Sequence, residues 1–279
     1  LLDLPVAERD WLVVGSTPQA LEAAGFIPLD QDFPVFLHPQ THEEYALARR
    51  ERKAGHGYKG FVVDSGPEVT LEQDLARRDL TINAIAEAPD GTLHDPFGGL
   101  EDIEQGMLRH VTPAFAEDPV RLLRIARMAS RLGHAGFRVA HGTQALLRRM
   151  VAAGEHRHLR PERVWKEMRR ALAERQPWRF IEVLHSCGAL DTLLPPLAAQ
   201  LAREHAEAGP PAGHGRPALP SLRALQCLAG QDDAVPARLA ALLLPALAAL
   251  DRPEQLRQWL PVERECLELL RVSARLQPD

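Results

Sequence analysis

Hydrophobic and polar residues follow different patterns in the first 110 residues and in the rest of the chain. Short apolar runs at residues 11–16, 33–38, 43–49 and 60–65 are separated by Gly, Pro and Asp, as is typical of β-strands and turns. From about residue 112 the apolar positions recur with the spacing of amphipathic helices. The pattern predicts an α/β unit followed by helices over residues 117–132, 142–153, 161–175, 177–187 and 189–204, with two to four more beyond residue 220.

Local signals mark where several of these elements begin and end. Thr70 and Gln73 have the spacing of a capping box, so a helix is expected to begin at Thr70. Asp90 and Gly91 lie between two short runs and predict a hairpin. The Pro- and Gly-rich residues 207–221 predict a linker.

Length and composition indicate an ordinary water-soluble protein with more than one packed unit. The chain has 279 residues, of which 45% are hydrophobic and 25% charged. No apolar run approaches the roughly 18–20 residues of a membrane-spanning helix, and the first residues lack the charged and apolar regions of a signal peptide, so we expect a cytoplasmic protein without membrane contact. Three cysteines, Cys187, Cys227 and Cys266, lack paired spacing and are predicted to be reduced and buried. The first residue is Leu, which leads us to expect a preceding segment.

Positive charge is concentrated in one part of a chain whose net charge is -5. Residues 117–180 contain fifteen Lys or Arg against six Asp or Glu. Such a basic segment is expected where a protein binds a phosphate-rich partner. A solvated helical surface rich in arginine explains the composition equally well.

Two carboxylates stand just before the first predicted strand. Glu8 and Asp10 are two residues apart, and alternate residues of a strand point to the same side. The pair is therefore either a divalent-metal site or a charged end of a strand, and spacing alone favours the second reading.

The segment from Asp118 to Arg131 carries a more specific pattern. Four arginines fall within an arc of about 120° when the helix is projected at 100° per residue, and apolar residues occupy the other side. Asp118 lies one turn before Arg121, so its carboxylate and the guanidinium can stand side by side. Together they match the amino group and ring nitrogen of cytosine or adenine, and they mismatch uracil and guanine. For an isolated helix, a solvated amphipathic surface is the commoner explanation.

Longer motifs resemble one family, the bacterial tRNA nucleotidyltransferases or CCA-adding enzymes, in the class that also contains bacterial poly(A) polymerases. The resemblance spans about residues 4–190. It rests on "ERDWLVVGSTPQ", "DFPVFLHPQTHEEYALARRERK", "TLEQDLARRDLTINAIA", "DPFGGLEDI", "AFAEDPVRLLRIAR" and "LRPERVWKEM", which occur in the family's order.

The resemblance implies an α+β protein with a DNA polymerase β-type nucleotidyltransferase head, a mixed sheet with helices, followed by an all-α neck, body and tail. We place the head at residues 1–111, the helical neck at 112–190 and the body and tail at 191–279. The implied reaction adds C, C and A to the 3′ end of tRNA from CTP and ATP with release of pyrophosphate, using Mg²⁺. No obligate protein partner is expected.

The resemblance also assigns roles to individual positions. Glu8 and Asp10 match the family's metal-binding pair, and Glu44 matches a third catalytic carboxylate. Nucleotide binding is implied for Arg78, Asp118, Arg121, Arg124 and Arg127. Asp79 is expected to anchor the turn beside Arg78, and the glycines Gly98 and Gly99 to form a hinge. The tRNA backbone is expected to follow basic residues of the neck, with Arg163, Lys166 and Arg170 as the main candidates beside Arg148, Arg149 and Arg169.

Three departures from the family pattern qualify this reading. The usual Gly-Gly and Arg-Asp segment would lie before Leu1. The metal pair is Glu-x-Asp in place of Asp-x-Asp, and glutamate is longer by one methylene. The C-terminal region has no His-Asp signature, so we predict no phosphohydrolase activity, and His205 and His214 are predicted to face solvent. A poly(A) polymerase and a catalytically weakened tRNA-binding homologue remain as alternatives.

Overall fold

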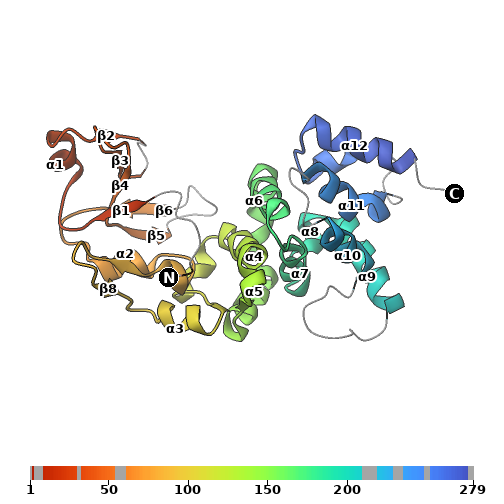
Figure 1. The fold of residues 1–279 in the computed structure, drawn as a ribbon, viewed down its shortest axis with the longest axis horizontal. Coiled ribbons are helices and arrows are strands. Elements are labelled where there is room, and N and C mark those ends of the chain that lie inside the picture. Colours follow the sequence, from red (N-terminus) through yellow and green to blue (C-terminus); the bar gives the residue numbers. More distant parts are fainter. Residues whose placement is uncertain are drawn as a thin grey trace. The chain divides into compact units, whose positions relative to one another are not determined.

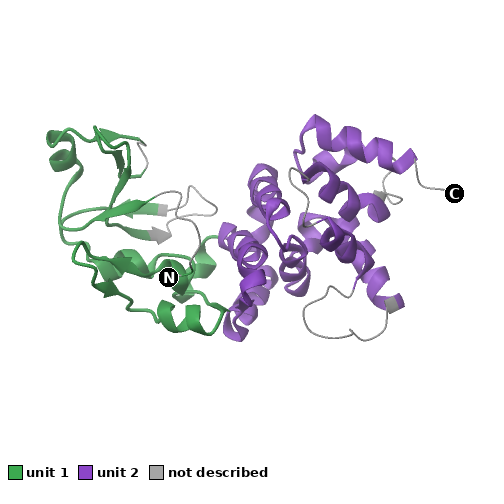
Figure 2. Ribbon diagram, viewed as in Figure 1, with its two compact units in different colours: residues 1–118 green, residues 119–279 purple. Residues whose placement is uncertain are grey.

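The chain folds into two compact units, residues 1–118 and residues 119–279 (Figure 2). The structure is a computed structural model and describes residues 2, 9–29, 33–53, 61–208, 219–228, 235–247 and 252–275. The first unit combines strands with short helices, and the second is mainly helical (Figure 1). The unit boundary follows Asp118, near the predicted end of the head at residue 111, while the further division at residue 190 stays a prediction.

A four-stranded mixed sheet forms the first half of the head. Its strand order is β1-β4-β3-β2, with β1 parallel to β4 and the other neighbours antiparallel. Leu21, Phe36 and Leu47 form a small buried core, against which Val13 and Phe26 pack. The sequence predicted β1, β3 and β4 but missed the short helix α1, whose Leu21 enters this core. The bounds are β1 Asp10–Val13, α1 Pro18–Ala23, β2 Ile27–Pro28, β3 Val35–Leu37 and β4 Glu44–Leu47.

Two hairpins and short helices complete the head. Thr70 accepts a hydrogen bond from the backbone of Gln73, whose side chain accepts from the Thr70 backbone, so the predicted capping box is confirmed. The predicted hairpin around Gly91 is also confirmed, since β7 pairs with β8 and Gly91 has φ 85°. The remaining bounds are β5 Arg50–Lys53, β6 Phe61–Asp64, α2 Leu71–Ala76, η1 Thr81–Asn83, β7 Ala86–Glu87, β8 Leu93–His94, α3 Gly99–Glu104, β9 Met107–Leu108 and η2 Pro113–Glu117.

The two glycines of the expected hinge form a capped, closely packed turn. Gly98 has φ 72°, in the left-handed region that favours glycine, and precedes α3. The Asp95 carboxylate accepts hydrogen bonds from the backbone N–H groups of Gly99 at 2.7 Å and Leu100 at 2.8 Å. Gly99 lies against the backbone of Thr81, so glycine is required here by close approach.

Replacing Gly99 with alanine is expected to destabilise the head by about 1–3 kcal/mol, the usual range for overpacking. A Cβ atom at Gly99 would meet the Thr81 carbonyl oxygen and lie 2.8 Å from Ile85 Cγ1. Gly66→Ala is the matched control, because the three atoms nearest to its Cβ would all belong to the side chain of Glu68, which can move aside. Urea unfolding of both variants checks this expectation, and equal midpoints would contradict it.

Two helices of the second unit each contact several others. Helix α4 contacts α6 and α7, and helix α11 contacts α9, α10 and α12. The four helices predicted between residues 117 and 187 are confirmed, although α4 begins at Val120, just after Pro119. The prediction of a single helix over 189–204 is wrong. The helix is interrupted at Leu194, because Pro195 and Pro196 have no N–H to continue it. The bounds are α4 Val120–Leu132, η3 Gly133–Ala135, β10 Arg138–Val139, α5 His141–Ala152, η4 Glu155–His158, α6 Pro161–Ala173, α7 Trp178–Ser186, α8 Leu190–Leu193, α9 Pro195–Ala208, α10 Pro220–Cys227, α11 Val235–Leu247, η5 Pro253–Gln258 and α12 Arg264–Arg275.

Smaller predictions had mixed outcomes. All three cysteines are free, but Cys227 is exposed, so the prediction of burial holds only for Cys187 and Cys266, where burial raises the pKa of each thiol. Cys227 is exposed because it ends α10 on the side away from the buried Leu222 and Leu225. The linker predicted over residues 207–221 loses two residues to α9 and two to α10, and its residues 209–218 lie outside the described part, as does His214. His205 is exposed as expected, and no described helix is long and apolar enough to cross a membrane.

Candidate active site

Asp10 and Glu44 lie side by side at the start of two neighbouring strands. They are Cα partners in the parallel pairing of β1 with β4, and both residues are exposed. Partners in register project to the same face of a sheet. The next pair, Trp11 and Tyr45, projects to the opposite face, where the two rings stack with centroids 5.6 Å apart. The structure therefore brings these two predicted catalytic carboxylates together.

Apolar packing on the back of the sheet fixes this register. Tyr45 packs edge-on against Phe26 at 5.0 Å, and Phe36 is its partner in β3. A slip by one residue would turn Trp11 to the carboxylate face and expose the aromatic cluster. The stacked aromatic residues thus keep Asp10 and Glu44 in register as neighbours in the sheet.

The donor set at this end of the sheet fits a hard divalent cation. Carboxylate oxygens are the ligands that Mg²⁺ prefers, and Asp10 and Glu44 both supply them. Within the described residues no group of three or more His, Cys, Asp or Glu could hold a metal ion. Glu8, the predicted second metal ligand, lies outside the described residues, so its role stays a prediction.

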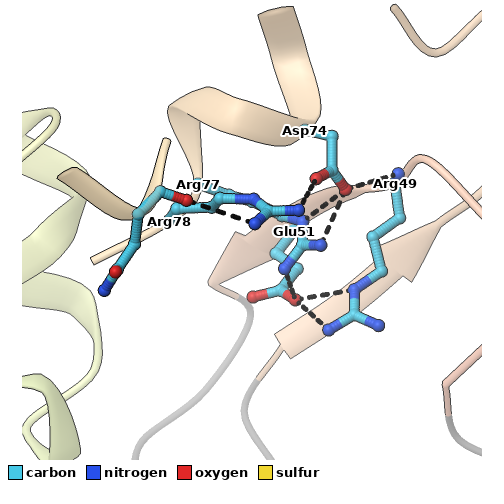
Figure 3. A network of polar contacts seen from close by, with 6 residues as sticks. Arg49, Glu51, Asp74, Arg77 and Arg78 are labelled. Atoms are coloured by element: carbon cyan, nitrogen blue, oxygen red, sulfur yellow. Dashed lines mark hydrogen bonds and ion pairs between the residues drawn. The ribbon is translucent and has the colours of Figure 1, made fainter. Parts of the chain in front are cut away.

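Arg78 follows α2 and is held from two sides (Figure 3). Its Nη1 donates to the Asn83 carbonyl oxygen at 3.2 Å, and its Nη2 donates to Asp74 Oδ2 at 3.4 Å. Asp79 Oδ1 accepts hydrogen bonds from the Leu80 N–H and from Asn83 Nδ2, both at 2.9 Å. Asp79 therefore anchors the turn that carries Arg78, as the sequence predicted.

Asp118 and the first arginines of α4 are less open than the helical projection predicted. Asp118 is half-buried in extended backbone just before Pro119, and Arg121 is only 9% exposed. Arg124 is half-buried. The two-sided pattern failed at Arg121 because α4 is buried around more of its circumference than its apolar residues alone indicate.

Arg127 forms a buried ion pair that sequence reasoning missed. Its Nε donates to Glu167 Oε2 of α6 at 2.7 Å, and the two side chains are 13% and 8% exposed. The partners are 40 residues apart, so no local spacing could have indicated the contact. Glu167 does stand within the motif "LRPERVWKEM", which was the one available signal.

The predicted RNA-binding residues share one side of α6. Arg163, Lys166 and Arg170 are spaced three and four apart, away from the buried Trp165 and Met168. Lys166 and Arg170 are exposed and Arg163 is half-buried. Arg149 is exposed on α5, whereas Arg148 donates to the Ser186 carbonyl oxygen and Arg169 pairs with Glu263 at 3.2 Å.

Comparison with known proteins shows which families this chain resembles. Residues 32–109 match the family described as poly(A) polymerase head domain, and residues 136–201 match that described as the probable RNA- and SrmB-binding site of polymerase A. The multifunctional CCA proteins of Nitrosococcus oceani and Alkalilimnicola ehrlichii are each 64% identical to this chain, over 195 and 197 residues. The chain is thus similar to the poly(A) polymerase family in its head domain and RNA-binding region, and to proteins named multifunctional CCA protein.

Similarity to the poly(A) polymerase family agrees with the fold. A solved tRNA nucleotidyltransferase complexed with a primer tRNA and an incoming ATP analog has a TM-score of 0.65 and 24% identity, covering 99% of this chain and 77% of that one. The fold prediction, a nucleotidyltransferase head followed by helical regions, is confirmed. The two multifunctional CCA proteins match 70% and 71% of this chain, and the chain spans about half the length of these curated relatives, at 47% and 48%.

The two family matches also give context to the predicted site residues. Glu44 and Arg78 fall inside the head-domain match, and the basic side of α6 falls inside the RNA-binding match. The family implies dependence on a divalent metal, which agrees with the carboxylate pair on β1 and β4. The individual roles of the site residues stay predictions.

Proposed function

We propose that this protein is a CCA-adding tRNA nucleotidyltransferase, which adds C, C and A to the 3′ end of tRNA from CTP and ATP in the cytoplasm. The observation that carries the proposal is the pairing of Asp10 with Glu44 in the head of a chain that is 64% identical to two proteins named multifunctional CCA protein. Paired carboxylates on adjacent strands are what metal-dependent phosphoryl transfer requires.

Asp10 and Glu44, joined by Glu8, are the proposed ligands of Mg²⁺. Bound there, Mg²⁺ would activate the 3′-hydroxyl of the tRNA and neutralise charge on the departing pyrophosphate. Arg78 contributes a guanidinium with a half-exposed side chain, suited to an anionic part of the nucleotide. Arg124 and Arg127 are the proposed further nucleotide ligands, and the pairing of Arg127 with Glu167 fixes the direction of its side chain.

Asp118 and Arg121 are proposed to select the base in place of a nucleic-acid template. A carboxylate accepts from the exocyclic amino group of cytosine or adenine, and a guanidinium donates to the adjacent ring nitrogen. Uracil and guanine present a carbonyl and an N–H there, so acceptor would face acceptor and donor would face donor. The partial burial of both residues strengthens this discrimination, because a mismatched pair cannot turn to water instead.

The basic side of α6 is proposed to follow the tRNA backbone. Arg163, Lys166 and Arg170 project from one side of a helix whose opposite side is packed. Their spacing suits successive phosphates, and such contacts weaken as salt rises.

A nucleotide-addition assay tests the proposed function against its alternatives. We expect tRNA lacking its 3′ CCA to incorporate two CMP residues and then one AMP in the presence of Mg²⁺, and tRNA that already ends in CCA to remain unextended. Gel resolution of the labelled products separates the outcomes. A long A tract would instead identify a poly(A) polymerase, and tRNA binding without incorporation would identify a catalytically weakened homologue.

A further inference from the structure

Asp74 lies at the centre of a polar network in the head that no predicted role accounts for. The network joins Asp74 of α2 to Arg49, Glu51, Arg77 and Arg78 (Figure 3). The Asp74 side chain is 0% exposed. A buried carboxylate is stable only when it is hydrogen-bonded and paired with charge.

The two oxygens of Asp74 have different partners. Oδ1 accepts hydrogen bonds from the backbone N–H of Arg49 at 3.1 Å and from Arg77 Nε and Nη2 at 2.9 and 2.7 Å. Oδ2 accepts from Arg78 Nη2 at 3.4 Å. One oxygen therefore serves the structural contacts and the other faces Arg78.

The three arginines of this network differ in how far they are buried. Glu51 accepts hydrogen bonds from Arg49 at 2.9 Å and from Arg77 at 3.1 Å. Arg49 also lies over the Phe33 ring, 4.7 Å from its centroid, and burial lowers its pKa. Arg78 is the most exposed of the three arginines, at 34% against 19% for Arg77 and 14% for Arg49. Arg78 is therefore the arginine of the three that is best placed to meet a ligand.

Arg77 and Arg78 thus differ in what they can do, although they are adjacent in sequence. Arg77 donates three nitrogens to Asp74 and Glu51. Arg78 makes one contact to Asp74 and one to the Asn83 carbonyl, and its buried Nε has no hydrogen-bond partner among the described residues. Both contacts use the Nη atoms, which leaves a further N–H on each for a ligand.

We infer that Asp74 is a positioning residue that orients Arg78 for the nucleotide, while Arg77 is structural. This inference rests on the proposed function, in which Arg78 binds CTP and ATP. Asp74 also holds the backbone of Arg49, two residues after β4, the strand that carries Glu44. One buried carboxylate therefore sets the position of the nucleotide-binding arginine relative to the strand of the metal ligands.

Asp74→Asn is the decisive variant because an amide can replace only one of the two oxygens. Its carbonyl oxygen is expected to remain with the three donors from Arg49 and Arg77, so its NH₂ group would face Arg78 Nη2, donor against donor. We expect the Kd for CTP, measured by calorimetry, to rise about tenfold, the loss of one charge-assisted hydrogen bond. The KM for CTP in nucleotide addition is expected to rise with it, while kcat changes less than about twofold.

A double-mutant cycle on CTP affinity separates positioning from general damage. Asp74→Asn and Arg78→Lys are expected to be non-additive, since both remove the same interaction, whereas Glu72→Gln on the exposed side of α2 is expected to leave affinity unchanged. Arg77→Lys is expected to lower the unfolding midpoint and to leave the Kd for CTP within about twofold. Additive effects of Asp74→Asn and Arg78→Lys, or an unchanged Kd in Asp74→Asn, would overturn the inference.

Misfolding of a variant and failure of the proposed function give different experimental results. If Asp74→Asn does not fold, Asp74→Glu keeps the charge but shifts the carboxylate by one methylene, and an unchanged Kd in that variant would overturn the inference. Wild-type protein that binds CTP but adds no nucleotide would refute the proposed function, while the binding cycle would still decide the role of Asp74. Wild-type protein that binds no CTP would refute both.

Discussion

Asp10→Asn is expected to lower the rate of nucleotide addition by about a thousandfold, because losing a metal-binding carboxylate removes several kcal/mol of transition-state stabilisation and each 1.36 kcal/mol is a factor of ten. Asp10 is exposed at the start of β1, so the isosteric change leaves folding nearly untouched. Single-nucleotide incorporation into tRNA lacking its CCA end measures the effect. Raising the Mg²⁺ concentration is expected to recover part of the rate, since the variant binds the ion more weakly.

Glu44→Gln and Glu43→Gln supply a matched comparison of two neighbouring residues at the start of β4. Glu44 is the register partner of Asp10, and its variant is expected to lose activity as Asp10→Asn does. Glu43 precedes β4 and accepts a hydrogen bond from Thr41 Oγ1 at 3.1 Å, which a glutamine oxygen can still accept. Its variant is expected to keep the wild-type rate within twofold. Equal activity of all three variants would remove Asp10 and Glu44 from the metal site.

The sequence predicted those parts of the fold that depend on local patterns. The capping box at Thr70, the hairpin at Gly91 and the helices from α4 to α7 were all found, because each is specified within a few residues. The missed helices α1 and α3 have six residues each, too few for a clear periodicity. What stabilises α1 becomes clear only in the folded structure, where Leu21 enters the core of the sheet.

Sequence motifs gave candidate residues for the site but not the side chains that hold them in place. Arg78 was assigned from a motif, yet the buried Asp74 that orients it and Glu51, which engages the neighbouring Arg77, were not. Arg127 was likewise assigned without its partner Glu167. Contacts between residues 26 or 40 positions apart leave no periodic signal in a single sequence, and a charged residue reads as solvated until its burial is known.

In the proposed base selection, replacing one oxygen atom of the Asp118 carboxylate by an NH₂ group is expected to have a large effect. Asp118→Asn is expected to lower the rate of CMP and AMP incorporation by about 10- to 100-fold, because a charge-assisted hydrogen bond to the base becomes a neutral one. Discrimination against UTP is expected to fall as well, because an amide can turn its NH₂ group toward the carbonyl of uracil, which a carboxylate cannot do. Rates with each nucleotide supplied singly measure both effects.

Asp191→Asn carries the same chemical change at an exposed position in α8 and is expected to keep wild-type rates and nucleotide choice. A lower rate in Asp118→Asn with unchanged discrimination against UTP would mean that Asp118 supports the fold around Pro119 without reading the base. Loss of discrimination requires that the side chain itself contacts the base edge, because burial and local packing are the same for Asp and Asn. The ratio of CTP to UTP incorporation therefore separates a template residue from a structural one, whatever the loss of rate.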